Sequence, residues 1–197
     1  MDIRAEKKEI RIRVLSLRDS LNEKEREYYS RKIYESFFSL SEIKDAKVFF
    51  LFVNFRTEVN TRPIIERLLS ENKKVVIPYT DIVNKRLILC YVDSLDNLKE
   101  GSYGILEPDP KICQRADAKD IDIAVIPGSV FDVTGGRVGY GGGFYDRTIP
   151  LFKPTTLKIA ITFDIQIVEK VPMGYYDKKM DVIISEKRII RIKNAES

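Results

Sequence analysis

Four glycines stand between two arginines in the stretch Arg137-Val138-Gly139-Tyr140-Gly141-Gly142-Gly143-Phe144-Tyr145-Asp146-Arg147. Glycine lets the backbone adopt conformations closed to other residues, and successive exposed N–H groups can form a concavity that binds anions. The two arginines carry planar, permanently charged groups that suit phosphate oxygens. Asp146 is a hard oxygen ligand of the kind that Mg²⁺ prefers. The stretch therefore predicts a site for a nucleoside triphosphate with its magnesium ion.

The same residues exclude two better-known phosphate-binding loops. A Walker A loop ends in Gly-Lys-Ser/Thr, which this stretch lacks. The dinucleotide pattern G-x-G-x-x-G would start at Gly139 and Gly141 but has Phe144 where the third glycine belongs. A glycine-rich surface turn is the simpler alternative, because clusters of glycine commonly mark turns.

The segments around this loop indicate an α/β fold. The run Ile121–Pro127 is typical of a buried strand leading into the loop, and Phe144–Thr148 is expected to begin a helix that Pro150 limits. Further strands are predicted at Ala46–Val53, Lys74–Pro78, Arg86–Val92, Lys158–Phe163, Asp181–Ser185 and Arg188–Ile192. Helices alternating with continuous apolar strands predict a layered α/β fold with a largely parallel sheet, in a single domain spanning residues 1–197.

The first predicted helix covers residues 3–21. Its buried stripe is predicted from the spacing of Ile10, Val14, Leu17 and Leu21. At about 100° per residue, three cations fall on a strip beside that stripe, from which they can reach toward a cleft: Lys7, Arg11 and Arg18. Helix geometry alone favours the alternative of a solvated basic face.

Signals for three further helices follow. Asn22 and Glu25 resemble a capping box, and the helix that they start has a core face of Tyr29, Ile33, Phe37 and Leu40. Thr61 can cap another helix with Pro63 in its first turn and with Ile64, Ile65, Leu68 and Leu69 facing inward. A short helix is predicted at Asp164–Lys170. The segment Asp93–Asp120 carries little regular pattern, which is typical of functional or mobile segments.

The composition narrows the possible chemistry. The chain has 197 residues, of which 44% are hydrophobic, and this is enough for a sizeable core. The net charge of +4 is too balanced to indicate nucleic-acid binding by itself. The chain has no histidine, so a Ser-His-Asp triad, a Cys-His pair and His-ligated zinc are excluded. Its chemistry must use carboxylates, tyrosines, cations and backbone groups, with or without a divalent metal.

The chain offers no sign of export. The charged segment Asp2–Arg13 is unlike a secretory signal, and no apolar run approaches the ~18 residues of a membrane span. Cys90 and Cys113 are the only cysteines, so a disulfide scaffold is not expected. Cys90 is assigned to packing within an apolar run and Cys113 to an incidental loop thiol. A reduced, cytoplasmic setting without a membrane partner is expected.

The residues around the glycine loop also resemble a known family. The segments Pro127–Asp132 and Gly136–Arg147 look like the signature of the 5-formyltetrahydrofolate cyclo-ligases, also called methenyltetrahydrofolate synthetases. Weaker matches occur in the expected order at Lys7–Arg11, Arg18–Leu21, Glu58–Thr61, Val171–Pro172, Asp177 and Asp181. The resemblance covers almost the whole chain and implies a three-layer α/β/α Rossmann-like sandwich.

This resemblance implies an activity and a set of site residues. The activity is the ATP- and magnesium-dependent conversion of 5-formyltetrahydrofolate to 5,10-methenyltetrahydrofolate, with release of ADP and phosphate. The positions that resemble nucleotide contacts are Lys7, Lys8, Arg11, Arg137, Val138, Gly139, Tyr140, Gly141, Gly142, Gly143, Phe144 and Tyr145. The positions that resemble folate contacts are Val53, Glu58, Tyr140, Gly141, Gly142, Gly143 and Phe144. Asp146 and Asp177 match the magnesium positions, and Arg147 and Tyr145 are the expected catalytic residues.

The implied chemistry suits a chain without histidine. Transfer of the γ-phosphoryl group to the formyl oxygen makes a good leaving group, which N10 of the folate can then displace. Such a transfer needs positioning and charge neutralisation more than a protein nucleophile. We hypothesise that Glu58 holds the pterin and Arg147 the transferring phosphate. Phe144 replaces a common tyrosine and Asn60 a frequent aspartate, but neither change removes a cation or a metal ligand.

Simpler alternatives stay open at several of these positions. Glu58 lies between a strand and a helix, where open α/β sheets place ligand groups, but ordinary loop carboxylates also occur there. Asp177 lies in a polar turn and would be solvated by default, and Asp181 is more simply a strand-start residue than a metal ligand. Tyr140 and Tyr145 can cover the loop or stack on pterin or adenine.

Two rival functions follow from the same residues. One is an ATP-dependent kinase or ligase with a different acceptor. The other is a binding module that has lost catalysis or that binds RNA through its basic first helix, although Arg11, Asp146 and Arg147 argue against lost catalysis. For the cyclo-ligase we expect a small-molecule substrate, no nucleic-acid partner and a monomer.

Overall fold

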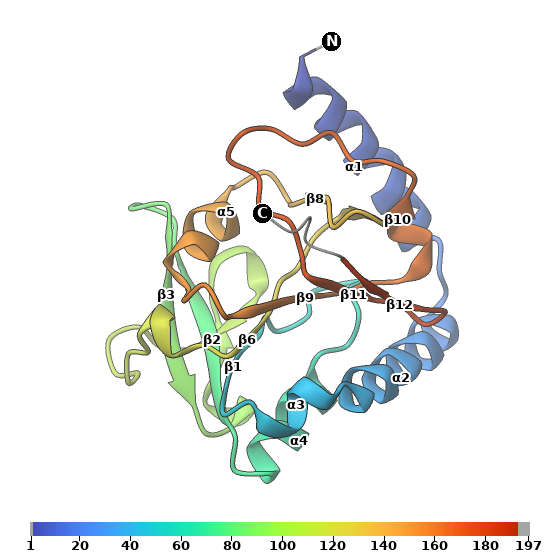
Figure 1. Cartoon of the computed structure of the whole chain (residues 1–197). Helices are drawn as coiled ribbons and strands as arrows, with labels where there is room; N and C mark the ends of the chain where they lie inside the picture. Colours follow the sequence, from blue (N-terminus) through green and yellow to red (C-terminus); the bar gives the residue numbers. More distant parts are fainter. Residues whose placement is uncertain (1, 193–197) are drawn as a thin grey trace.

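A seven-stranded sheet forms the centre of the computed structural model, which describes residues 2–192 (Figure 1). Its strand order is β12-β11-β9-β6-β1-β2-β3. The bounds are β1 (Val48–Phe50), β2 (Lys74–Asp81), β3 (Arg86–Val92), β6 (Ile123–Val125), β9 (Leu157–Ile161), β11 (Val182–Ile184) and β12 (Ile189–Arg191). The five strands from β11 to β2 run parallel, and the two outer strands are antiparallel to their neighbours. The predicted largely parallel sheet is confirmed.

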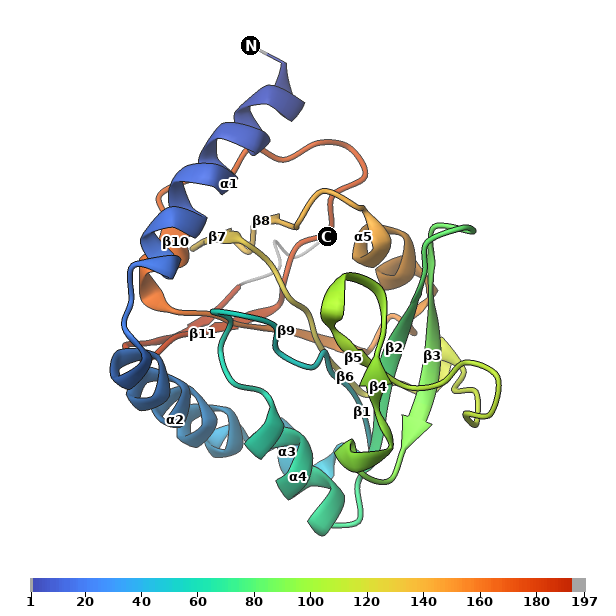
Figure 2. The same cartoon turned by 180° about the vertical axis from the view of Figure 1, so that it is seen from behind.

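Helices cover both faces of this sheet, as the two opposite views show (Figures 1 and 2). One face carries α2 (Glu23–Ser39), α3 (Ser41–Asp45) and α4 (Arg62–Ser70). The other carries α1 (Ile3–Asp19), α5 (Phe144–Thr148) and a small sheet of β7 (Val130–Asp132), β8 (Arg137–Val138) and β10 (Ile167–Val168). A two-stranded hairpin, β4 (Lys99–Glu100) with β5 (Leu106–Glu107), lies outside both sheets.

Alternate residues of the central strands supply two separate hydrophobic cores. Phe49 and Ile123 pack in one cluster with Ile33 of α2, whereas Phe50 and Ala124 belong to a second cluster on the opposite face. This follows from the alternation of side chains along a strand. A parallel sheet covered on both faces therefore needs strands that are apolar throughout, as observed here. The Rossmann-like designation and the single domain over residues 1–197 stay predictions.

The predicted helix starts are largely confirmed. Asn22 and Glu25 form a capping box, with the Glu25 N–H donating to Asn22 Oδ1 at 3.0 Å and the Asn22 N–H donating to Glu25 Oε2 at 2.9 Å. Thr61 is the N-cap residue of α4, but its hydroxyl oxygen accepts from the Asn54 N–H at 2.9 Å and makes no bond to the helix. Thr61 therefore anchors the loop after β1 rather than capping α4.

The buried stripe predicted for α1 is wrong at Leu17. That side chain is 45% exposed, whereas its neighbour Arg18 is only 6% exposed. Helix α1 contacts β7 and the segment Asp164–Gln166, so Val14 is its main core residue. The turn of α1 that carries Arg18 packs against polar loops, which is why a charged side chain is buried there.

Two other predicted elements need correction. Within Ala46–Val53 only Val48–Phe50 forms a strand, although the following residues stay buried. The helix predicted at Asp164–Lys170 is a single 3₁₀ turn, η5 (Asp164–Gln166), followed by β10. Ile167 and Val168 pair with β7 because these β-branched residues suit a strand. Short 3₁₀ turns also occur as η1 (Leu95–Asn97), η2 (Ser102–Gly104), η3 (Ala118–Asp120) and η4 (Ile149–Leu151).

The two cysteines form a disulfide, contrary to the expectation of one packing residue and one loop thiol. Cys90 lies in β3, and Cys113 lies 23 residues further along the chain with its Cα 5.6 Å away. The chain returns to β3 just there, since the Tyr91 N–H donates to Gln114 O at 2.9 Å and the Ala116 N–H to Leu89 O at 3.0 Å. The irregular segment is thereby fastened to the edge of the main sheet. Disulfides also occur inside the cells of hyperthermophiles.

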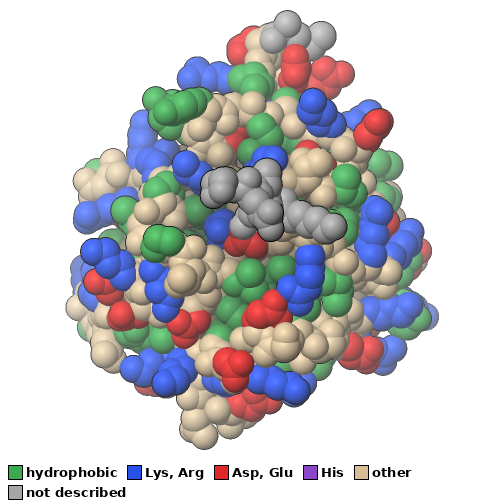
Figure 3. All heavy atoms as spheres, in the orientation of Figure 1, with side chains coloured by type: hydrophobic (Ala, Val, Ile, Leu, Met, Phe, Trp, Pro, Cys, Tyr) green, Lys and Arg blue, Asp and Glu red, His purple; other side chains and the backbone are tan. Residues whose placement is uncertain are grey.

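The surface carries both signs of charge. Figure 3 shows lysine and arginine side chains interspersed with aspartate and glutamate over the visible face, without one large basic field. This distribution agrees with the small net charge of +4. Within residues 2–192, every helix is too short or too polar to span a bilayer.

Candidate functional site

The glycine loop, residues 139–143, runs from β8 to the start of α5. Gly141 and Gly143 have φ values of +102° and +65°, in the left-handed region that favours glycine. The loop is held from both sides: the Ser129 hydroxyl donates to Val138 O at 2.8 Å, and Arg11 Nε donates to Gly139 O at 2.8 Å. The loop is therefore a fixed part of the structure rather than an ordinary surface turn.

A buried carboxylate shapes the turn that precedes the loop. Asp132 is 1% exposed and accepts from the Gly136 N–H at 2.9 Å, the Thr134 N–H at 2.8 Å and the Val171 N–H at 2.8 Å. Burial alone would raise the pKa of Asp132, but these hydrogen bonds outweigh it and leave the pKa below its ordinary value. Asp132 thus stays ionised and holds β7, β8 and the segment after β10 together.

The basic strip of α1 points into the protein. Lys7 forms an ion pair with Asp177, Arg11 binds the carbonyl of Gly139, and Arg18 Nη1 donates to Tyr140 Oη at 2.7 Å. The solvated basic face that helix geometry favours is therefore wrong for these three residues. Lys8 differs, because it is exposed and has no polar partner within the described part of the chain.

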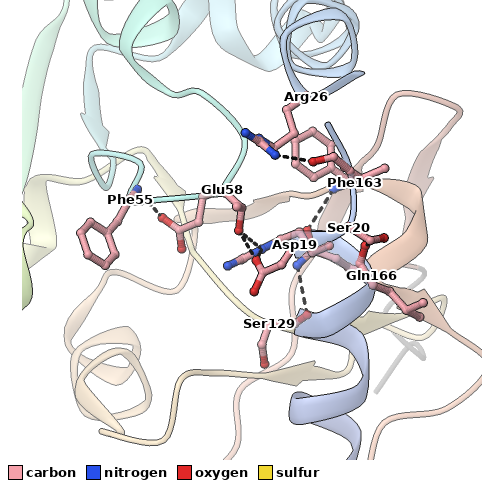
Figure 4. A network of polar contacts seen from close by, with 12 residues as sticks. Asp19, Ser20, Arg26, Phe55, Glu58, Ser129, Phe163 and Gln166 are labelled. Carbon is pink, nitrogen blue, oxygen red and sulfur yellow. Dashed lines mark hydrogen bonds and ion pairs between the residues drawn. The ribbon is translucent and has the colours of Figure 1, made fainter. Parts of the chain in front are cut away.

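Glu58 closes one end of the site. It lies in the loop after β1, near the C-terminal end of α1, where Figure 4 shows it beside Phe55 and Asp19. Its Oε2 accepts from the Phe55 N–H at 2.8 Å, and its Oε1 accepts from the Tyr140 hydroxyl. Glu58 is therefore built into the site and is not an ordinary loop carboxylate.

Burial dominates the electrostatics of this pair. It raises the pKa of Glu58, against the opposing effects of the Tyr140 hydroxyl, the Phe55 N–H and the charge of Arg18. Burial, reinforced by the charge of Glu58, also raises the pKa of Tyr140. At neutral pH, Tyr140 is accordingly a neutral phenol that donates its proton to Glu58.

The other end of the loop contains a second ion pair. Arg137 is 3% exposed, and its Nη2 lies 2.5 Å from Asp146 Oδ1. Its Nη1 donates to Pro127 O at 3.0 Å, whereas its Nε is buried without a hydrogen-bond partner among the described residues. Arg137 lies beneath the loop and orients Asp146.

Arg147 lies on the surface beside the same loop. Its Nη2 donates to Gly142 O at 2.8 Å, and its Nε donates to Lys85 O at 2.7 Å in the turn between β2 and β3. Its guanidinium carbon is 5.4 Å from the centre of the Phe144 ring. Both polar partners are backbone carbonyls, so no acidic side chain within residues 2–192 neutralises the charge of Arg147.

Tyr145 and Val53 belong to the packed interior more than to an open site. The Tyr145 ring lies 6.1 Å from that of Phe50, and Val53 is 4% exposed. Burial raises the pKa of Tyr145, and the charge of Glu58 raises it further. Of the two alternatives for Tyr145, the structure supports a hydrophobic cover.

The described residues contain no cluster of three or more acidic, cysteine or histidine side chains that could hold a metal by themselves. Asp146 is paired with Arg137, and Asp177 with Lys7. Each aspartate uses a single carboxylate oxygen in these contacts, so each keeps a second hard oxygen donor. Magnesium is commonly bound by one or two carboxylates together with water and substrate phosphates. The donor set fits a metal that arrives with its nucleotide.

Sequence reasoning missed some polar partners in this site. Arg18 was placed on the basic strip but not among the site residues, although it contacts Tyr140 directly. Thr57 was not singled out, yet it accepts from Arg18 Nε at 3.0 Å and donates to Asp19. Arg18 lies two helical turns after Arg11, and this spacing could have indicated that it belongs to the site. No sequence pattern indicates a role for Thr57, because an isolated threonine in a loop has no periodicity.

The fold and the site define a class of protein: an α/β protein with a cation-flanked, hydrogen-bonded glycine loop next to a half-buried carboxylate acceptor. The sequence matches the model of the 5-formyltetrahydrofolate cyclo-ligase family over residues 3–186. The chain therefore belongs to the 5-formyltetrahydrofolate cyclo-ligase family of enzymes.

Individual relatives agree with this assignment. A 5-formyltetrahydrofolate cyclo-ligase of Haemophilus influenzae is 27% identical, over 90% of this chain and 97% of its own length. The solution structure of the 5,10-methenyltetrahydrofolate synthetase of Aquifex aeolicus is 32% identical and covers 97% of this chain and 95% of its own, with a TM-score of 0.85. A synthetase structure from Mycoplasma pneumoniae, at 22% identity and a TM-score of 0.74, shows the same fold.

Proposed function

We propose that this protein converts 5-formyltetrahydrofolate to 5,10-methenyltetrahydrofolate at the expense of ATP, with release of ADP and phosphate. The main observation behind the proposal is that two groups of residues with different chemistry lie at the two ends of one glycine loop. Glu58 and Tyr140 supply a hydrogen-bonded polar anchor at one end, and Arg147 supplies at the other a cation that is bound to backbone carbonyls. The family membership supplies the substrate pair.

The residues divide into two groups in this proposal. The folate group consists of Glu58, Tyr140 and the glycine loop, in which the carboxylate of Glu58 accepts N–H donors of the pterin. Phe144 and Tyr140 offer ring faces for stacking. Val53 is 4% exposed, so its part in folate binding would be to support the loop after β1 that carries Glu58. The nucleotide group consists of Lys7, Lys8, Arg11 and Arg147 around the loop backbone.

Asp146 and Asp177 would hold magnesium, which supplies charge neutralisation for the triphosphate when bound. Arg137 orients Asp146 and Lys7 orients Asp177 through these ion pairs. We expect Lys7 to exchange its contact with Asp177 for one with a phosphate oxygen when the nucleotide enters. Arg137 is too deeply buried for such an exchange and acts by orienting Asp146.

The reaction needs no protein nucleophile. Arg147 and the loop N–H groups would steady the γ-phosphoryl group as it passes to the formyl oxygen, so that the charge on its oxygens is neutralised. The lone pair of N10 then attacks the formyl carbon, the carbon–oxygen bond breaks with phosphate as the leaving group, and N10 loses its proton. Because N5 and N10 belong to one molecule, the attack is intramolecular and gains from proximity.

A spectrophotometric assay tests the proposal. The purified protein should produce the absorbance of the methenyl product from 5-formyltetrahydrofolate only when ATP and Mg²⁺ are both present. Replacing 5-formyltetrahydrofolate with other carbonyl or hydroxyl acceptors should abolish ADP release. ADP release with a different acceptor, and none with the folate, would favour the rival kinase or ligase. Absence of calorimetric heat from Mg·ATP, with or without the folate, would contradict both enzymes.

RNA binding through α1 receives no support from the geometry, because Lys7, Arg11 and Arg18 are all engaged inside the protein. A monomeric state and a cytoplasmic location are kept as predictions. Sedimentation and fractionation of source cells would test them.

A further inference from the structure

Arg18 is a charged side chain buried at the junction of three segments. It is 6% exposed, and it projects from the last turn of α1 between the loop after β1 and the glycine loop. Its Nε donates to Thr57 Oγ1 at 3.0 Å and its Nη1 donates to Tyr140 Oη at 2.7 Å. A single guanidinium thus ties the helix to both substrate-facing loops.

These two hydrogen bonds can run in one direction only. A guanidinium carries donors and no acceptor, so the hydroxyl oxygens of Thr57 and Tyr140 must both accept from Arg18. Each hydroxyl has a single proton, and each gives it to a carboxylate: Thr57 to Asp19, and Tyr140 to Glu58. Arg18 therefore starts two chains of hydrogen bonds, each ending on an acidic residue.

The consequence appears at Glu58. The Phe55 N–H and the Tyr140 hydroxyl both donate to the side chain of Glu58, so this carboxylate acts only as a hydrogen-bond acceptor. A carboxylate has about four lone-pair sites, and two of them are used here. A ligand that takes the remaining sites must bring N–H donors. The pyrimidinone edge of a pterin, with an amino group beside a ring N–H, has this character.

Resting on the proposed function, we propose that Arg18 is a positioning residue that fixes the direction of the Tyr140–Glu58 hydrogen bond, so that Glu58 presents only acceptors to the pterin N–H groups. Arg18 acts through Tyr140 and does not touch the nucleotide. Its loss should therefore weaken folate binding selectively. The charge of Arg18 also lowers the pKa of Glu58 against the effect of burial.

The experiment compares Arg18→Met with Arg13→Met, a matched control on the exposed face of the same helix. Arg18→Met should raise the KM for 5-formyltetrahydrofolate by about 10- to 100-fold, the range for loss of a hydrogen bond to a charged group. The KM for Mg·ATP should change by less than about 2-fold, since the polar contacts of Arg18 are with Thr57, Tyr140 and Asp19 and not with the cations of the nucleotide group. Arg13→Met should leave both values unchanged.

The pH profile separates positioning from a merely structural role. The titratable and charged groups near Glu58 are Arg18 and Asp19 from α1, Tyr140 from the glycine loop and Tyr145 from α5. Both tyrosines are neutral at working pH, so Arg18 is the charge that opposes burial. In Arg18→Met the acid limb of kcat/KM for the folate should move to higher pH, with no such movement in the profile for Mg·ATP.

If Arg18→Met does not fold, the same measurements are made on Arg18→Lys. It keeps the charge but loses the fork that reaches two acceptors, so the folate KM should rise at least about 3-fold. An unchanged folate KM in either folded variant overturns the proposal, as does an equal rise in both KM values. Additive effects of Arg18→Met and Tyr140→Phe would also overturn it, because one chain of bonds requires coupling. A wild-type protein without folate turnover would instead refute the proposed function.

Discussion

The two ends of the glycine loop are built differently. At the Glu58 end, every polar contact joins a donor to an acceptor in a fixed direction, starting from the buried Arg18. At the other end, carboxylates are paired with cations of the protein itself: Asp146 with Arg137 next to the loop, and Asp177 with Lys7 of α1. The first end is complete before a ligand arrives. At the second end, we propose that a triphosphate replaces the contact between Lys7 and Asp177.

This difference suggests a division of labour. A preorganised polar anchor gives specificity, because a ligand lacking the right donors leaves buried groups unpaired. Ion pairs that exchange for ligand contacts give less affinity per contact, since the protein's own interactions are lost when the ligand binds. We expect variants at the Glu58 end to change folate binding, and variants at the Asp146 end to change nucleotide use and turnover.

Arg147→Ala should have the largest effect on turnover. The side chain has no acidic partner among the described residues and lies beside Phe144 and Gly142, so we expect its charge to be available to the transferring phosphoryl group. Catalytic arginines in phosphoryl transfer contribute about 10³-fold or more. We expect kcat to fall about 10³-fold in a coupled assay of ADP release, and Arg62→Ala, an exposed arginine on α4, serves as the control. A kcat within about 3-fold of wild type would show that Arg147 only fastens the loop to Lys85.

Glu58→Gln should come next. It places an amide among donors that require an acceptor, and it removes the charge that attracts pterin N–H groups. Loss of charged hydrogen bonds suggests a rise in the folate KM of about 100-fold, with the KM for Mg·ATP unchanged. Steady-state kinetics with each substrate varied in turn would measure this. Equal changes in both KM values would contradict the separation of the two ends.

The same substitution, Glu58→Gln, should make the folded protein more stable although it weakens folate binding. The pKa of Glu58 is raised in the folded state, so its ionisation opposes folding at neutral pH, and that cost is relieved as the pH falls through the raised value. Glu58→Gln should therefore raise Tm at neutral pH, and the advantage should shrink toward acid pH. Thermal melts of both proteins across this range provide the measurement.

Lys7→Met should have a smaller effect, on the nucleotide end. It removes a cation that is only partly buried and leaves Asp177 with the Gly174 N–H as its remaining partner. We expect the KM for ATP to rise about 10-fold, with little change in the folate KM. Lys8→Met is the matched comparison, since Lys8 has the same charge but is exposed. A larger effect on the KM for ATP at Lys8 than at Lys7 would contradict the proposal that Lys7 exchanges Asp177 for a phosphate oxygen.

Reduction of the disulfide should have the smallest effect on catalysis and a clear effect on stability. The link between Cys90 and Cys113 closes a loop of about 23 residues, for which the chain-entropy model gives about 3 kcal/mol. For a protein of this size that corresponds to a fall in Tm of about 6–12 °C. Melts with and without a dithiol reductant would test this, with Cys113→Ser melting like the reduced protein. A change in either KM at 25 °C would link the edge segment to the site.

The sequence predicted the parts of this molecule that depend on local patterns. Asn22 and Glu25 gave the start of α2, and the apolar runs gave the central strands because both sheet faces are covered. The glycine loop was found because several unusual residue types fall within one short stretch. Helical spacing also placed Lys7, Arg11 and Arg18 on one strip, although it could not say which way the strip pointed.

What local patterns could not supply were contacts between distant segments. Leu17 was wrongly assigned to the core and Arg18 was overlooked as a site residue, because what packs against the end of α1 is a set of loops far away in sequence. The disulfide was missed since two isolated cysteines give no pairing signal until β3 and the returning segment are placed side by side. The ion pairs of Asp146 with Arg137 and of Asp177 with Lys7 could not be predicted from local sequence patterns either.

The sequence by itself determined the layered α/β architecture, the rigid glycine loop and the absence of histidine chemistry, since these depend on residue type and near-neighbour spacing. Only the tertiary structure decided which way each hydrogen bond of the site runs and which charges are already paired. Those properties depend on donors and acceptors brought together over long sequence separations, as when Tyr140 meets Glu58 and Arg18.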